Sequence, residues 1–69
     1  MKKIKGLLPY QILTKRETEI TDLLIKGYTT GEISSHLNIK SNTVSTIKKN
    51  IFLKLKVDSV IELYKLLNN

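Results

Sequence analysis

Apolar residues recur every three or four positions along most of this 69-residue chain, the spacing of helices that bury one face. Three segments begin with the same signal, a threonine or serine followed three residues later by glutamate. In such a capping box the hydroxyl accepts a hydrogen bond from the glutamate amide, and the carboxylate accepts one from the amide of the capping residue. The boxes begin at Thr14, Thr29 and Ser59.

The pattern predicts an all-α fold class with four helices. Gly27 and Asn38 follow the first two, where a residue in the left-handed conformation is expected. We expect residues 1–12 to form a basic arm or linker and residues 13–69 to form one domain. The predicted helices run from Thr14 to Gly27, from Thr29 to near Leu37, from about Asn42 to Leu55, and from Val60 to about Leu67.

The third predicted helix starts differently from the others. Ser41 is expected to cap it, but its first turn holds no carboxylate, which leaves positive potential and free amides there. That arrangement binds phosphate. A need for Val44 in the core explains the missing glutamate equally well, and the two explanations are compatible. The helix lies in an acid-free stretch, residues 34–56, that contains five lysines.

The two faces of the third helix differ in chemistry. One face is apolar, with Val44, Ile47, Ile51 and Leu55. The other carries small polar and basic side chains, which can pair with base edges and phosphates. Its members are Asn42, Ser45, Thr46, Lys49 and Asn50, together with Leu53. A short helix, a four-residue turn and a longer helix with such a face are typical of a helix-turn-helix.

Composition supports this interpretation and excludes others. The net charge of +6 and the pI near 9.7 favour nucleic acid, although charge alone leaves an anionic membrane surface open as a partner. With no cysteine and one histidine, His36, the sequence offers no metal set and no nucleophile–base pair. We therefore expect neither an enzyme nor a cofactor. No apolar run approaches the roughly 20 residues of a membrane span, and we expect a cytoplasmic protein.

The segment from Leu13 to about Leu67 resembles the LuxR/GerE-type helix-turn-helix domain, which ends many bacterial two-component response regulators. The residues that carry the resemblance are Leu13-Thr14 with Arg16-Glu17, Gly27, Glu32-Ile33, Leu37, Ile39, Thr43-Val44, Asn50-Ile51, Lys54-Leu55 and Val57. Residues 42–46 with Lys48 are most similar to the subgroup found in regulators of virulence and fimbriae. The chain can be a stand-alone regulator or an output domain, and the sequence leaves both open.

The resemblance implies a four-helix domain with residues 30–49 as the helix-turn-helix segment. The helix from Asn42 would lie in the major groove, and the last helix would join two copies into a homodimer on an inverted repeat of double-stranded DNA. Ser45, Thr46 and Lys49 fall where family members touch base edges. Thr30, Ser41, Thr43, Lys48 and Asn50 fall where they touch the backbone.

The sequence also departs from the family pattern. Gly31 and Ser45 each replace a frequent lysine, Ile47 a frequent histidine, Leu53 a frequent arginine and Lys56 a frequent glycine. These departures put the base preference in doubt.

Our main hypothesis is a sequence-specific DNA-binding transcription regulator that docks electrostatically through Lys48, Lys49 and Lys54. The rival is a small protein-interaction module that docks on RNA polymerase or another regulator through its basic face. Because partner-binding helices usually present apolar anchors, and only Leu53 would serve as one, the polar face argues against the rival. Polymerase is also a candidate partner under the main hypothesis.

Overall fold

The computed structural model describes residues 12–68, and within that range the chain forms four α-helices and no strand. This confirms the all-α, four-helix fold class. The predicted arm, residues 1–12, lies outside the described residues except for Ile12. The helices are α2 (Lys15–Ile25), α3 (Thr30–Leu37), α4 (Ser41–Leu55) and α5 (Val60–Leu67).

Two of the predicted capping boxes are complete. The Thr14 hydroxyl accepts from the Glu17 amide at 3.2 Å, and the Glu17 carboxylate accepts from the Thr14 amide at 2.8 Å. The second box, at Thr29 and Glu32, has the same two bonds, at 3.1 and 2.8 Å. Local sequence therefore fixes where α2 and α3 begin.

The third capping box, predicted at Ser59, is only half formed. The Ser59 hydroxyl accepts from the Glu62 amide at 3.2 Å, as expected. The Glu62 carboxylate, however, accepts from the amide of Asp58 at 2.6 Å rather than from that of Ser59. The carboxylate thus holds the residue one position earlier and fixes the entry of the chain into α5.

Residues with positive φ follow the first three described helices. Gly27 has φ +96°, and Asn38 and Lys56 each have φ +57°. The left-handed conformation predicted for Asn38 is confirmed. Lys56 adopts it without the help of a glycine, at a cost, because the Cβ atom then approaches the following carbonyl oxygen.

The prediction that Ser41 caps the third helix was wrong. Lys40 is the capping residue, it makes no side-chain capping hydrogen bond, and Ser41 is the first residue of α4. The helix thus begins one residue earlier than expected. The predicted absence of acid in its first turn is confirmed.

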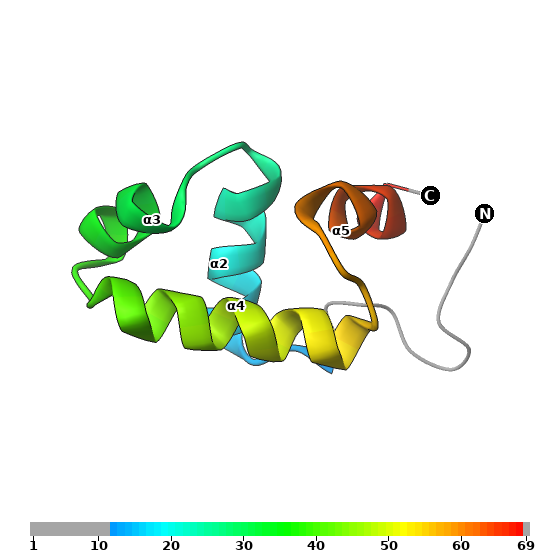
Figure 1. Cartoon of the computed structure of the whole chain (residues 1–69), viewed down its shortest axis with the longest axis horizontal. Coiled ribbons are helices and arrows are strands. Elements are labelled where there is room, and N and C mark those ends of the chain that lie inside the picture. The colour runs from blue at the N-terminus through cyan, green and yellow to red at the C-terminus, as the bar shows by residue number, and fades with distance from the viewer. Residues whose placement is uncertain (1–11, 69) are drawn as a thin grey trace.

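The core lies where the four helices meet. Figure 1 shows α4 along the longest axis, with α3 over its N-terminal end, α5 near its C-terminal end and α2 crossing behind it. Helix α2 packs against all three others. Each helix contributes at least one residue with no exposed surface: Ile20, Ile33, Val44, Ile51 and Leu63. The small core thus holds α4 by one face and leaves its other face free.

The apolar residues of α5 differ in their burial. Leu63 is fully buried, whereas Leu66 and Leu67 are partly buried and pack against the core. Ile61 and Tyr64 are exposed, with 67% and 52% of their surface accessible. Within residues 12–68, no helix is long and apolar enough to cross a membrane.

Candidate nucleic-acid interface

The short helix and the long helix are joined by a tight turn. Residues 38–40 connect α3 to α4, which is three residues rather than the expected four, because α4 begins at Ser41. The left-handed Asn38 reverses the chain, and the amide of Ile39 donates to the Ser34 carbonyl at 3.0 Å. Ile39 packs against the core. The turn thus fixes α3 relative to α4.

The N-terminus of α4 is open. The first intrahelical hydrogen bond runs from the Val44 amide to the Lys40 carbonyl, at 3.1 Å. The amides of the preceding residues therefore have no intrahelical acceptor, and no side chain caps them. Ser41, Asn42 and Thr43 are all exposed. Amide donors, hydroxyls and the positive end of the helix dipole are thus accessible to an anion at one place.

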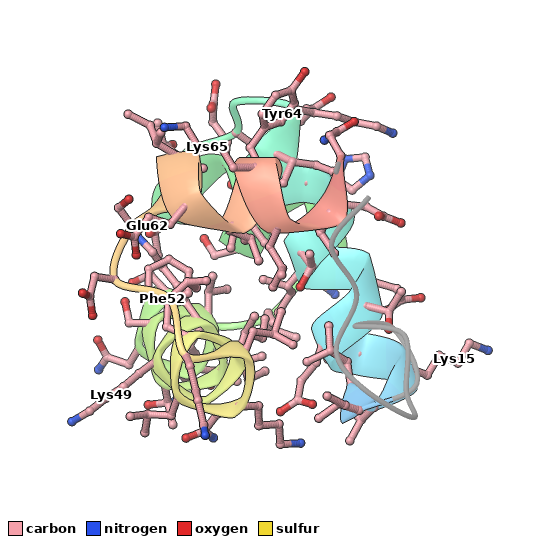
Figure 2. The ribbon with its side chains drawn as sticks, turned by 90° about the vertical axis from the view of Figure 1, so that its right-hand side faces the viewer. Lys15, Lys49, Phe52, Glu62, Tyr64 and Lys65 are labelled. Atoms are coloured by element: carbon pink, nitrogen blue, oxygen red, sulfur yellow. The ribbon has the colours of Figure 1, made fainter. Side chains whose placement is uncertain are left out.

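The outer face of α4 is exposed where the sequence predicts base contacts. Ser45, Thr46, Lys49 and Asn50 are all exposed, while Val44 and Ile51 on the other face are fully buried. In Figure 2 Lys49 points away from the body of the domain, on the side of α4 remote from α2. Ile47 is partly buried and packs against the core. The helix therefore presents a continuous small-polar surface with one projecting cation.

Two of the predicted backbone-contacting residues are only half exposed. Thr30 is the first residue of α3 and is partly buried. Lys48 is also partly buried, and its ammonium lies 5.6 Å from the centre of the Phe52 ring. A cation over an aromatic face is held in place by the charge distribution of the ring. The Lys48 ammonium thus lies beside Phe52 along the flank of α4, whereas Lys49 points away from the domain.

Lys54, expected from the sequence to dock on DNA, has a partner inside the protein. Its Nζ lies 2.7 Å from Oε1 of Glu17, at the start of α2. Burial raises the pKa of Glu17, but the hydrogen bonds from Lys54 and Thr14 and the Lys54 charge outweigh this, so the pKa lies below its ordinary value. Sequence reasoning explained Glu17 by its cap alone and missed this contact, which joins residues 37 positions apart.

Two further exposed side chains are His36 and Leu53. His36 is exposed, and its ring lies 6.0 Å from that of Tyr28 in an edge-on arrangement. No group of three or more potential metal ligands occurs among the residues that the structure describes. On α4, Leu53 is exposed, with 67% of its surface accessible.

Comparison with known proteins assigns this arrangement of helices to a family. The model of a family described as bacterial regulatory proteins, LuxR family, matches residues 11–67. The chain belongs to that family. The predicted resemblance is thus confirmed over nearly the whole domain, and the LuxR family is a class of DNA-binding transcription regulators with a helix-turn-helix. That α3 and α4 are its helix-turn-helix segment stays a prediction.

Relatives of this LuxR-family chain are regulatory proteins. It is 47% identical over 53 residues to the uncharacterized response regulatory protein YgeK of Escherichia coli K12, covering 77% of this chain and 36% of YgeK. It is 44% identical over 55 residues to the oxygen regulatory protein NreC of Staphylococcus carnosus, covering 80% of this chain and 25% of NreC. NreC of Staphylococcus aureus matches to the same extent. The match thus spans about a quarter to a third of the length of these relatives. Membership of the virulence and fimbrial subgroup stays a prediction.

Proposed function

We propose that this LuxR-family domain binds double-stranded DNA sequence-specifically and regulates transcription, with α4 in the major groove. One observation carries the proposal: α4 exposes a face without acids, built from small polar side chains and Lys49, and its N-terminus is open. A major groove about 12 Å wide admits a helix, and short side chains let the backbone approach the base edges.

The proposed contacts divide by position along the segment. Lys49, which points away from the domain, reads a base edge together with Ser45 and Thr46, and a lysine in this role most often pairs with guanine O6 or N7. The remaining predicted contacts surround these three and hold the sugar–phosphate backbone. They are Thr30 on α3, Ser41, Asn42 and Thr43 at the open helix start, and Lys48 and Asn50 on the flanks of α4.

A homodimer through α5 is part of the proposal. Ile61 and Tyr64 leave apolar surface exposed on this helix. Figure 2 places Tyr64 on the outer side of α5, away from the direction in which Lys49 points. Two copies joined there could each present α4 to one half of an inverted repeat. RNA polymerase remains a further candidate partner, and a cytoplasmic location is expected for such a regulator.

The test begins with selection of bound sequences from a random duplex pool, followed by affinity measurements on the selected site. Lys49→Ala should weaken specific binding by about 1–3 kcal/mol and relax the preference at one base pair. Lys15→Ala is the matched control, because it removes the same charge from an exposed position at the start of α2, on the side of the domain remote from Lys49 (Figure 2). Equal losses in both variants would show that net charge, and not the face of α4, determines binding.

The rival function, a protein-interaction module, rests on Leu53. This side chain is 67% exposed on α4 and could anchor a helical partner. A single apolar residue makes a poor anchor surface, however, since binding hot spots cluster in well-packed patches. Leu53→Ser separates the two functions, because it should abolish docking of a protein and leave the affinity for the selected duplex unchanged.

A further inference from the structure

The ion pair between Lys54 and Glu17 connects the recognition helix to the start of α2. Lys54 lies one turn beyond Asn50 on α4, and its Nζ donates to Oε1 of Glu17 at 2.7 Å. The Glu17 side chain is 9% exposed and that of Lys54 is 37% exposed. The pair is therefore shielded at its acidic end and partly open to solvent at its basic end.

The carboxylate of Glu17 is also held by the start of its own helix. The same oxygen, Oε1, accepts from the Thr14 amide at 2.8 Å, and the Glu17 amide donates to the Thr14 hydroxyl at 3.2 Å. A capping box of this kind forms within one turn of α2 and needs no tertiary contact. Lys54 thus binds a carboxylate that the start of α2 already orients, and its bond ties α4 to that point.

The position of Lys54 would suit a phosphate contact if its charge were available. Taking Lys54 away to a phosphate would leave a buried carboxylate without its cationic partner, which is unfavourable. Lys49 has no such constraint, since the structure gives it no carboxylate partner within residues 12–68 and it points away from the domain. The two lysines therefore have different roles, although they lie only five positions apart on one helix.

We propose that Lys54 is a positioning residue of DNA recognition and not a phosphate contact: it remains bound to Glu17 on DNA and sets the direction in which α4 presents its reading face. This inference rests on the proposed function. Helix α4 is anchored by Val44 near its start and by Leu55 at its end, both in the core. Lys54 adds a directional bond to this non-directional packing, and so restricts rotation and tilt of α4 on α2.

The test compares Lys54→Met, which keeps an unbranched stem without the charge, with Lys54→Arg, which keeps a donor for Glu17. Affinities for the selected duplex and for a random duplex are measured over a series of salt concentrations, after urea unfolding has shown each variant to be folded. Lys48→Met, at a proposed contact to the sugar–phosphate backbone, is the control and should reduce the slope of log affinity against log salt by about 0.9, the value of one phosphate contact. This control distinguishes loss of a DNA-bound charge from loss of a positioning bond.

For Lys54→Met we expect an unchanged slope and a ratio of specific to random affinity that falls by roughly tenfold, about the effect of one mismatched base pair. Lys54→Arg should keep the ratio of specific to random affinity close to that of the wild type. A slope reduced by about 0.9 in Lys54→Met would overturn the inference, and so would an unchanged ratio. A second readout does not depend on the affinity of any variant. In the wild-type protein, the NMR chemical shift of the Glu17 carboxylate carbon should not change on saturation with DNA. A change to the value seen in Lys54→Met would contradict the inference. Failure of the wild type to bind any duplex would instead overturn the proposed function itself.

Discussion

Thr21 carries a buried hydroxyl that has no hydrogen-bond partner among the described residues. It lies in α2 with none of its surface exposed, and its Oγ1 is unsatisfied. A buried polar group in this state costs about 1–3 kcal/mol. Thr21→Val replaces the hydroxyl by a methyl group of nearly the same size, and valine and threonine have similar helix propensities.

We therefore expect Thr21→Val to raise the free energy of unfolding by about 1 kcal/mol, near the lower end of that range, because the site can relax in the wild type. For a domain of this size the midpoint of thermal unfolding should rise by roughly 4–8 °C. Urea unfolding followed by circular dichroism at 222 nm measures the first quantity, and a thermal scan the second.

Thr18→Val is the matched control on the same helix. The Thr18 hydroxyl donates to the Thr14 carbonyl at 3.0 Å, and the side chain is partly exposed. Its replacement removes a satisfied hydrogen bond and should give no gain in stability. If Thr21→Val proves neutral or destabilising while Thr18→Val behaves as described, the hydroxyl of Thr21 is satisfied in solution and the reasoning is refuted.

Three further predictions concern charge, backbone and surface. Because folding lowers the pKa of Glu17, its carboxylate stabilises the fold above the unfolded pKa of about 4.3, and this contribution is lost as pH falls through the folded pKa. The difference in free energy of unfolding between wild type and Glu17→Gln, measured in urea, should therefore close on acidification, and a constant difference would contradict this. Gly27→Ala should lower the free energy of unfolding by about 1–2 kcal/mol because φ is +96°. Gly31→Ala, in the first turn of α3 with only the Thr29 hydroxyl oxygen near its added Cβ, should raise it by up to about 1 kcal/mol, and similar thermal shifts for both variants would contradict the backbone argument. Leu53→Ser should change unfolding and DNA affinity by less than about 0.5 kcal/mol, because the side chain is 67% exposed, and a larger loss of DNA affinity would make it part of the interface.

The elements of this fold could be predicted because their signals are local. The hydroxyl and carboxylate of each capping box lie within one turn, so the starts of α2 and α3 follow directly from Thr14 and Thr29. The left-handed residue at Asn38 is local as well. The start of α4 was placed one residue late because a serine is a good cap in general, yet here Lys40 holds the capping position without a side-chain bond.

The candidate site was predictable in its exposure and not in its charge pairing. Helical periodicity alone separates Lys49 from Ile51, and the structure places them on the exposed and buried sides. The pairing of Lys54 with Glu17, by contrast, depends on how α2 crosses α4 (Figure 1). No spacing in the sequence encodes that crossing, and the same holds for the orphaned hydroxyl of Thr21.

The central claim is that the outer face and open start of α4 bind DNA. An NMR titration of the wild-type domain with a selected duplex, followed by backbone amide shifts at low and at raised salt, tests it most directly. We expect saturable shifts that are largest over residues 41–50 and an affinity that falls as salt rises, by a slope of roughly −0.9 for each phosphate contact. Shifts centred on Leu53 and the outer side of α5 with residues 41–50 unmoved, or an affinity independent of salt, would contradict the claim.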